Sequence, residues 1–272
     1  MIIWSKYFSY YLGLLWSDGH ITRGTIYLSI LKTDALEIKD NLEKIDFLKF
    51  CFYDSKRSGR KDQFRMNINN VKFYDDFISM YFKDKSNASP DKLLNIIPIE
   101  FKRYFFLGLI DGDGCFSINK KGQDRKLRIA STYDQDWNYL LSMSKEIGIT
   151  KAKINRIIRN SVNKYSIFTI SDYDDLVKII HFLYPNGFEF GLKRKYNKAK
   201  HILDKLVTRQ NHTKIDIFEL SDMVENNNDI IFLSKHYNCH WQKIYSVCKK
   251  HDIKYKSGFF SNLSKKLEAS NG

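Results

Sequence analysis

The pattern of apolar and polar positions in this chain predicts one series of elements that is given twice. Each series opens with an apolar helical run and continues with two strands, a helix, two more strands and a last helix. After the opening helix of the first half, strands and helices are predicted over residues 25–31, 34–47, 50–53, 64–68 and 71–82. The corresponding segments of the second half are residues 115–118, 127–130, 134–147, 151–157, 165–170 and 173–183. We therefore predict an internal duplication.

This order of elements also predicts the fold class. Antiparallel strand pairs that have helices packed on one face of their sheet define an α+β fold. We expect two pseudo-symmetric αββαββα repeats with antiparallel sheets, followed by a small helical C-terminal region. The predicted boundaries are residues 1–97, 98–206 and 207–272, and a polar linker broken by Pro90 and Pro98 joins the two repeats.

The opening helix of each repeat ends in the same unusual pattern, over residues 11–19 (YLGLLWSDG) and 106–114 (FLGLIDGDG). Small residues four positions apart share one helix face, where a partner helix can approach closely. An acidic residue and a glycine then end the helix, and the glycine fits the left-handed conformation of a helix C-cap. The predicted helix-interface residues are Gly13, Ser17, Gly108 and Gly112, and the predicted caps are Gly19 and Gly114.

The acidic residues of the two patterns are Asp18 and Asp113. Each lies at the C-terminal end of a helix, where the helix dipole is already negative. Two carboxylates brought together there need a cation, and a divalent metal ion is the natural candidate. A single aspartate in this position is most simply interpreted as a capping or surface residue, but a matched pair in matched contexts favours metal ligation.

These two motifs resemble those of the LAGLIDADG homing endonucleases, in the single-chain form that carries two copies. The second copy is close to the family pattern, whereas the first has Tyr11, Leu12, Trp16 and Ser17 at four of its positions. The acid at the eighth position, which is the metal ligand in the family, is present in both copies as Asp18 and Asp113. The resemblance covers residues 1–206.

The resemblance implies a site-specific, Mg²⁺-dependent double-strand DNA endonuclease in which Mn²⁺ substitutes for Mg²⁺. Such an enzyme is encoded by a mobile intron or free-standing mobile gene, acts as a monomer on a long target site and leaves short 3′ overhangs. Asp18 and Asp113, with the neighbouring Ser17 and Gly112, form the predicted metal site. The family also places a basic residue late in each repeat, for which Lys92 and Lys195 are the candidates and Lys85 or Lys193 the alternatives.

The open faces of the two sheets are the predicted DNA-binding saddle. Polar residues alternate with apolar ones along the strands, and such a face can enter the major groove or contact phosphates. The bland alternative for any one of these residues is a solvated sheet face. The predicted DNA-binding residues are Arg23, Thr25, Tyr27, Ser29, Lys56, Arg57, Gln63 and Arg65 in the first repeat, and Asn119, Lys121, Gln123, Arg125, Arg128, Lys153, Asn155, Arg156, Arg159 and Lys164 in the second.

Composition and charge agree with a polyanionic partner. The formal net charge is +14, and Lys and Arg are spread along the whole chain, which favours an extended basic surface. No apolar run is long enough to span a membrane, and the N-terminus leads directly into the first motif helix, so we expect no signal peptide and an intracellular, reducing location. The four cysteines form no C-x-x-C pair and are expected to be reduced core residues.

The C-terminal region resembles a helix-turn-helix, with helices expected over residues 230–237 and 240–251 and Asn238 in the turn. Gln242, Lys243 and Lys249 would then contact DNA. A zinc site made of Cys239, His240, Cys248 and His251 is disfavoured because these spacings do not match common sites. A plain helical cap on the second repeat remains the other alternative.

A different class of function is binding without cleavage, as an intron-RNA maturase or a transcription regulator of the same fold. The retained acids argue against it, because a pure binder gains nothing from two crowded carboxylates. An unspecific nuclease is also disfavoured, because it would not need so large a polar sheet surface.

Overall fold

The computed structural model divides into two compact units, Met1–Ile202 and Leu203–Gly272. It describes residues 2–22, 25–55, 63–119, 125–159, 163–210, 215–226, 232–233, 236–237, 239 and 241–255, without the side chains of residues 55, 63, 205–210 and 241–243. The first unit contains both predicted repeats. The division between the units falls within helix α9 (Lys193–Gln210), close to the predicted boundary after residue 206.

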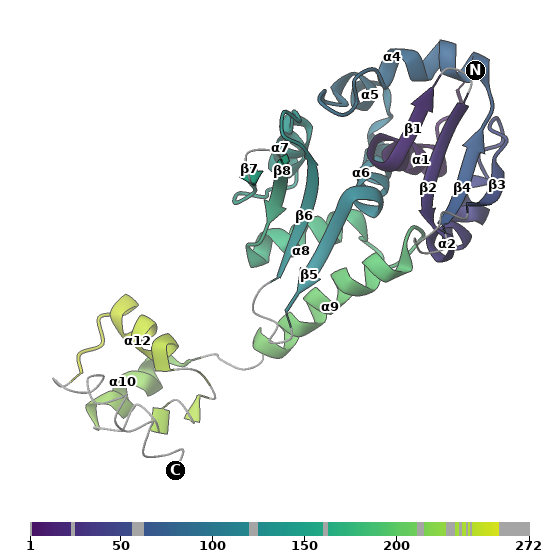
Figure 1. Ribbon diagram of the computed structural model, residues 1–272. Coiled ribbons are helices and arrows are strands. Elements are labelled where there is room, and N and C mark those ends of the chain that lie inside the picture. Colours follow the sequence, from purple (N-terminus) through teal and green to yellow (C-terminus); the bar gives the residue numbers. More distant parts are fainter. Residues whose placement is uncertain are drawn as a thin grey trace. The chain divides into compact units, whose positions relative to one another are not determined.

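Two antiparallel sheets, each four-stranded in the described part of the chain, belong to the first unit, one per repeat (Figure 1). Their strand orders, β1-β2-β4-β3 and β5-β6-β8-β7, are equivalent. The strands of the first sheet are β1 (Gly19–Thr22), β2 (Thr25–Leu31), β3 (Cys51–Ser55) and β4 (Gln63–Ile68). The strands of the second are β5 (Gly114–Ile118), β6 (Arg125–Thr132), β7 (Lys153–Arg159) and β8 (Asn163–Ile170). The predicted α+β fold with duplicated antiparallel sheets is confirmed.

The helices of the first unit follow the predicted order with several differences. They are α1 (Lys6–Asp18), α2 (Lys32–Leu42), α3 (Val71–Phe73), the π-helix η1 (Tyr74–Ile78), α4 (Ser79–Tyr81), α5 (Asp91–Ile96), α6 (Ile99–Asp113), α7 (Asn138–Glu146), α8 (Tyr173–Leu183) and α9. The segment predicted as one helix over residues 71–82 is divided by the π-helical turn. Strand β1 and helices α5 and α9 were not among the predicted segments, and α2 and α7 are shorter than predicted.

Helices α1 and α6 pack against each other at the centre of the unit, between the two sheets (Figure 1). Gly13 and Gly108 lie at the contact. A Cβ atom added to Gly13 would lie 2.0 Å from the backbone oxygen of Phe105, and one added to Gly108 would lie 2.0 Å from that of Tyr10. The helices therefore touch backbone to backbone, as small residues four apart allow.

The predicted left-handed caps at Gly19 and Gly114 are wrong. Their φ angles are −69° and −75°, and each residue begins a strand, β1 or β5, directly after its helix. Glycine is required there for space, because an added Cβ would lie 2.2 Å from the Leu15 oxygen or 2.6 Å from that of Ile110. Gly148, shortly after helix α7, does have the left-handed conformation, with a φ of +75°.

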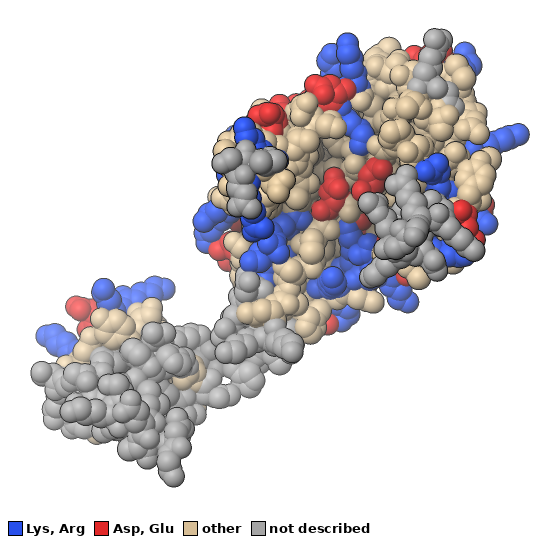
Figure 2. All heavy atoms as spheres, viewed as in Figure 1, with Lys and Arg blue, Asp and Glu red and all other residues tan. Residues whose placement is uncertain are grey.

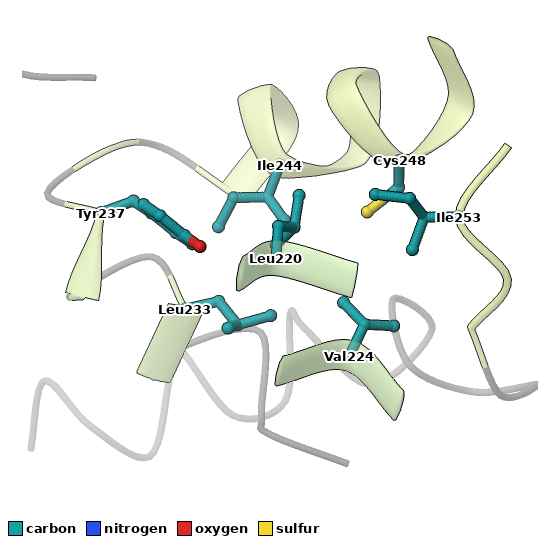
Figure 3. Packing of buried hydrophobic residues seen from close by; sticks show 7 residues of the cluster. All are labelled: Leu220, Val224, Leu233, Tyr237, Ile244, Cys248 and Ile253. Atoms are coloured by element: carbon teal, nitrogen blue, oxygen red, sulfur yellow. The ribbon is translucent and has the colours of Figure 1, made fainter. Parts of the chain in front are cut away.

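The second unit has its own small core (Figure 3). Helix α10 (Ile217–Glu225), which was not predicted, directs Leu220 and Val224 towards Ile244 and Cys248 of helix α12 (Trp241–Lys250). Leu233, Tyr237 and Ile253 complete the cluster. The predicted turn residue Asn238 and His240 lie outside the described residues. The described part is thus a helical unit that buries the apolar face of the predicted second helix.

The cysteines form no disulfide, but only part of the prediction for them is correct. Cys248 is buried and Cys239 is half-buried, whereas Cys51 and Cys115 are exposed because the strand register turns them away from the helices. Within the described residues, no helix has both the length and the apolar character needed to cross a membrane.

The substitution Gly108→Ala tests the helix contact. Its methyl group would meet the backbone of Tyr10, so the helices must separate, and we expect the free energy of unfolding to fall by at least about 2 kcal/mol. Chemical denaturation measures the change, with the exposed Ser142→Ala in α7 as the control. An unchanged midpoint for Gly108→Ala would show that the helices do not pack this closely.

Candidate metal and nucleic-acid site

Asp18 and Asp113 are the last residues of α1 and α6, so the packing of these helices brings the two acids to one place. A Cβ atom on Gly112 would lie 1.8 Å from the Ser17 hydroxyl oxygen and 3.2 Å from Oδ2 of Asp18. The missing side chain of Gly112 therefore leaves room for the end of the other helix. Figure 2 shows acidic side chains between the two halves of the first unit, with Lys and Arg on both sides.

The electrostatics of the two acids reflect this crowding. Solvent still reaches both residues, but the protein around them removes part of their hydration. Burial, and then the charge of Asp18, raise the pKa of Asp113 to about 6. Burial also raises the pKa of Asp18, against the opposing effect of Lys195, Lys85 and Arg194. The site thus favours a bound cation.

One lysine lies at the end of each motif helix, the half-buried Lys85 at α1 and the buried Lys195 at α6. Lys85 Nζ donates to the carbonyl oxygens of Trp16 (2.9 Å) and Ser17 (3.0 Å) at the end of α1. Lys195 Nζ donates to those of Ile110 (2.7 Å), Asp111 and Gly112 (3.0 Å) at the end of α6. The Ile110 carbonyl also accepts from the Gly114 N–H, whereas the other carbonyls belong to the last turn, where the helix supplies no donor. The ammonium groups satisfy them and oppose the helix dipole.

Burial lowers the pKa of both lysines, and that of Lys195 falls to about 8. The candidate Lys195 lies at the end of its motif helix, close to the acid pair, whereas the candidate Lys92 does not. Lys92 is exposed on α5, and Lys85, named only as an alternative, takes the equivalent position at α1. Lys193 uses its backbone N–H to donate to Glu37 (3.0 Å) instead of approaching the helix end.

Asp111, the sixth residue of the second motif, is a buried residue that sequence reasoning did not single out. Its Oδ2 accepts hydrogen bonds from the Tyr10 hydroxyl and the Leu192 N–H, each at 2.8 Å, while its Oδ1 is buried without a partner. Burial raises its pKa to about 6. In the first motif the same position holds Trp16, which packs on Phe82. The two halves of the site are therefore chemically different.

The donor set fits a divalent cation that prefers oxygen. Of the four predicted ligands, Ser17 donates its hydroxyl to Leu14 (3.0 Å) and Gly13 (3.3 Å) of its own helix, and the Gly112 carbonyl accepts from Lys195. The two carboxylates remain. The described residues contain no group of three or more His, Cys, Asp or Glu suited to a metal ion. Two carboxylates completed by water and phosphate oxygens match the coordination of Mg²⁺.

The register of the first sheet turns the predicted residues Thr25, Tyr27, Ser29 and Arg65 to its open face, together with the backbone position of Gln63. The Arg65 guanidinium lies 4.3 Å from the centre of the Tyr27 ring, which fixes its position. His20 and Asn67 share this face and were not predicted. In the second sheet the same face holds the predicted residues Arg128, Lys153, Asn155 and Arg159, and also Lys126.

Three predicted residues of the second sheet lie on the other face. The register aligns Arg125, Arg156 and Lys164 with buried positions of the helix-covered side. Arg125 lies 5.1 Å from the Tyr173 ring centre, and Arg156 Nε donates to the carbonyl of Tyr133 (3.1 Å). Alternation was misjudged because these strands carry polar residues on both sides. Asn119 is exposed after β5, and Lys249 is exposed on α12.

Several predicted DNA contacts cannot be placed. Arg23, Lys56, Arg57, Lys121 and Gln123 lie outside the described residues, as do the side chains of Gln63, Gln242 and Lys243.

Comparison with known proteins agrees with this geometry. Residues 106–202 match the model of the LAGLIDADG endonuclease family. The chain is similar to the LAGLIDADG homing endonuclease I-GzeII, solved in complex with a DNA target, at 13% identity over 77% of this chain and 93% of that chain, with a TM-score of 0.50. It is also similar to the homing endonuclease I-WcaI bound to its DNA recognition sequence, at 15% identity over 72% and 86% of the two chains, with a TM-score of 0.50.

Full-length DUF199/WhiA from Thermatoga maritima aligns at 15% identity over 90% of this chain and 89% of that chain, with a TM-score of 0.44. No curated protein sequence matches the chain. The matching model and the shared fold define the class. The second repeat belongs to the LAGLIDADG endonuclease family, and the first unit has the fold of the LAGLIDADG homing endonucleases.

The substitution Asp113→Asn tests the crowding of the two acids. The folded state holds the Asp113 proton more tightly than the unfolded chain does, so this residue costs stability as the pH rises from about 4 through about 6. At pH 7.5 without divalent ions we expect the variant to be more stable, by about 1 kcal/mol after allowing for solvent access. The difference should disappear near pH 4.

Thermal unfolding with and without Mg²⁺ measures these effects. Mg²⁺ should raise the melting temperature of the wild type and have less effect on the variant. The exposed Asp76→Asn, which breaks the ion pair with Lys72, is the matched control. Equal stabilities of wild type and Asp113→Asn at pH 7.5 would contradict the crowding.

Proposed function

We propose that this protein is a site-specific DNA endonuclease that hydrolyses both strands of a duplex with the help of a divalent metal ion. The observation that carries the proposal is the pair Asp18 and Asp113 at the adjoining ends of two closely packed helices. Each acid has a lysine at the end of its helix, the half-buried Lys85 or the buried Lys195. The pseudo-symmetry of this arrangement matches that of a duplex with one scissile phosphate in each strand.

The residues divide the chemistry as follows. Asp18 and Asp113 would hold Mg²⁺, for which Mn²⁺ can substitute, between their carboxylates and the DNA phosphates. The ion would neutralise phosphoryl charge and activate a water molecule. Lys85 and Lys195 keep positive charge beside the two acids, which opposes their repulsion and favours an approaching phosphate.

The open sheet faces would supply recognition. Arg65, Arg128 and Asn155 are of the types that pair with base edges in the major groove, and Lys126, Lys153 and Arg159 suit phosphate contacts. Two such faces in one chain support a long double-stranded target bound by a monomer. The net charge of +14 supports the same partner. Both similar structures with a TM-score of 0.50 are, by their descriptions, bound to DNA.

Cleavage of the DNA that flanks the gene in its host tests the proposal, because a mobile nuclease interrupts or neighbours its own target. With Mg²⁺ the wild type should cut a plasmid carrying the joined flanks once, in both strands, and a chelator should abolish cutting. Asp18→Asn and Asp113→Asn should each lower the rate by at least about a hundredfold, because each removes a metal ligand.

The control is again Asp76→Asn, which should cut like the wild type. Binding by electrophoretic mobility shift separates the outcomes. If the wild type binds the flanking DNA tightly and never cuts it, the protein is a silent binder, and retention of intron RNA would then identify a maturase.

We further propose that the C-terminal unit is a second DNA-binding element. Its core holds α12 by Ile244 and Cys248, which leaves Tyr245, Lys249 and Lys250 exposed along the opposite side of the helix. A basic helix face held by a small helical core is the arrangement of a recognition helix.

The double substitution Lys249→Ala and Lys250→Ala tests this role. If both lysines contact phosphates, affinity for the target should fall by roughly tenfold at low salt, and the slope of log affinity against log salt should decrease by about two. Fluorescence anisotropy across a salt series measures both. Lys39 of α2, which pairs with Glu43 directly after the helix, offers the control Lys39→Ala. An unchanged salt slope in the double variant would exclude the contact.

A further inference from the structure

Two short segments, here called straps, bring Lys85 and Lys195 to the C-terminal ends of α1 and α6. The first strap, residues 84–88, follows helix α4 of the first repeat and carries Lys85. The second strap, residues 191–195, follows helix α8 of the second repeat and carries Lys195. Each lysine reaches the motif helix of its own repeat, α1 or α6.

Each strap is attached to the opposite repeat. Three residues at the end of β6 and shortly after it, in the second repeat, hold the first strap. The Thr132 hydroxyl lies against the Ser86 carbonyl and is 3.2 Å from Oδ1 of Asn87, and Gln135 Nε2 donates to the Ala88 carbonyl (2.8 Å). The Asp136 N–H donates to the Asn87 carbonyl (3.0 Å). Gln135 is 2% exposed, so its amide is fixed in the interior.

Helix α2 of the first repeat holds the second strap. Arg194 makes a bidentate ion pair with Asp34, with Nε–O distances of 2.8 and 3.0 Å and an Nη2–Oδ2 distance of 2.6 Å. The Lys193 N–H donates to Oε2 of Glu37 (3.0 Å). The Asp34 side chain is 5% exposed, whereas that of Arg194 is 46% exposed. A planar fork of this kind restricts both position and direction.

The backbone of both straps is also constrained just before the lysine. Asp84 has a φ of +55°, and its carbonyl accepts from the N–H groups of Asn87 (3.0 Å) and Ala88 (2.9 Å). Gly191 has a φ of +107°, and a Cβ atom there would lie 2.7 Å from Oδ2 of Asp111. The backbone before each lysine therefore has a conformation that a flexible chain would rarely adopt.

We propose that the straps form a reciprocal lock, in which each repeat positions the lysine of the other. Gln135 is the positioning residue for Lys85, and Asp34 is the positioning residue for Lys195. Lysine has a long, flexible side chain, so anchoring its backbone removes much of the freedom it would otherwise have. The consequence for cleavage rests on the proposed function, but the lock itself does not.

Amine labelling tests the lock without requiring any activity. The full chain is treated briefly with an acetylating N-hydroxysuccinimide ester, and the modification rate of each lysine is measured by mass spectrometry. Asp34→Asn should increase the rate at Lys195 by roughly three- to tenfold and leave Lys85 unchanged, and Gln135→Leu should do the reverse. Asp76→Asn should change neither. Loss of general structure would instead expose both lysines together.

Milder variants guard against poor folding. Glu37→Ala removes only the acceptor for Lys193, and Thr132→Val keeps the side-chain shape while removing its hydroxyl. They should give the same selectivity at Lys195 and Lys85 with smaller increases. The lock would be overturned if all four variants raised the modification rates of Lys85 and Lys195 equally. It would also be overturned if no variant raised either rate.

Strand-resolved cleavage provides the second readout. On target DNA labelled separately on each strand, Asp34→Asn and Gln135→Leu should slow opposite strands and accumulate opposite nicked products. Equal slowing of both strands would contradict separate positioning. If the wild type does not cut, the proposed nuclease function fails, and the labelling result still decides whether the lock exists.

Discussion

The backbone contact between α1 and α6 is the constraint on which the rest of the first unit depends. Gly13 and Gly108 each face a backbone oxygen of the other helix, at a distance that no side chain tolerates. Because both helices pass through this contact and end after the same number of residues, their terminal carboxylates arrive together. The contact also fixes the separation of the two sheets, since β1 and β5 begin directly at Gly19 and Gly114.

The close packing of α1 and α6 concentrates negative charge, which the lysines of the two straps offset. Two helix C-termini and two carboxylates concentrate negative charge, and Asp111 adds a buried carboxyl nearby. Lys85 and Lys195 place ammonium groups against the terminal carbonyls, where they both cap the helices and offset that charge. The site therefore combines stabilising cations with exposed acids that still attract a metal ion, instead of neutralising the acids by direct ion pairs.

The sequence allowed the duplicated fold, the two acids and the close helix contact to be predicted, because each is encoded by local periodicity or by a repeated motif. Strand β2 and helix α8 have the predicted bounds. Lys85 was harder to assign because the repeats differ in length between their last common helix and the lysine. Asp34 and Gln135 could not be found from pattern, since their importance comes from contacts with residues far away in the chain.

Polar residues on both sides of the strands of the second sheet also limited the prediction of sheet faces. Arg125 and Arg156 occupy helix-side register positions where an apolar residue is the usual expectation, so alternation alone could not assign them. The additional helix α10 was not predicted, although Leu220 and Val224 lie four residues apart on its buried face.

The sixth motif position shows that the two halves of the duplication are not interchangeable. Oδ2 of Asp111 accepts from the hydroxyl of Tyr10, and the residue equivalent to Tyr10 in the second repeat is Phe105, which has no hydroxyl. Two copies of the second repeat, joined as a symmetric pair, would bury both acids without that donor. Two copies of the first would have Trp16 in place of the acid. A symmetric pair of either half would therefore lack the hydrogen bond between Tyr10 and Asp111 that joins α1 to α6 in this chain.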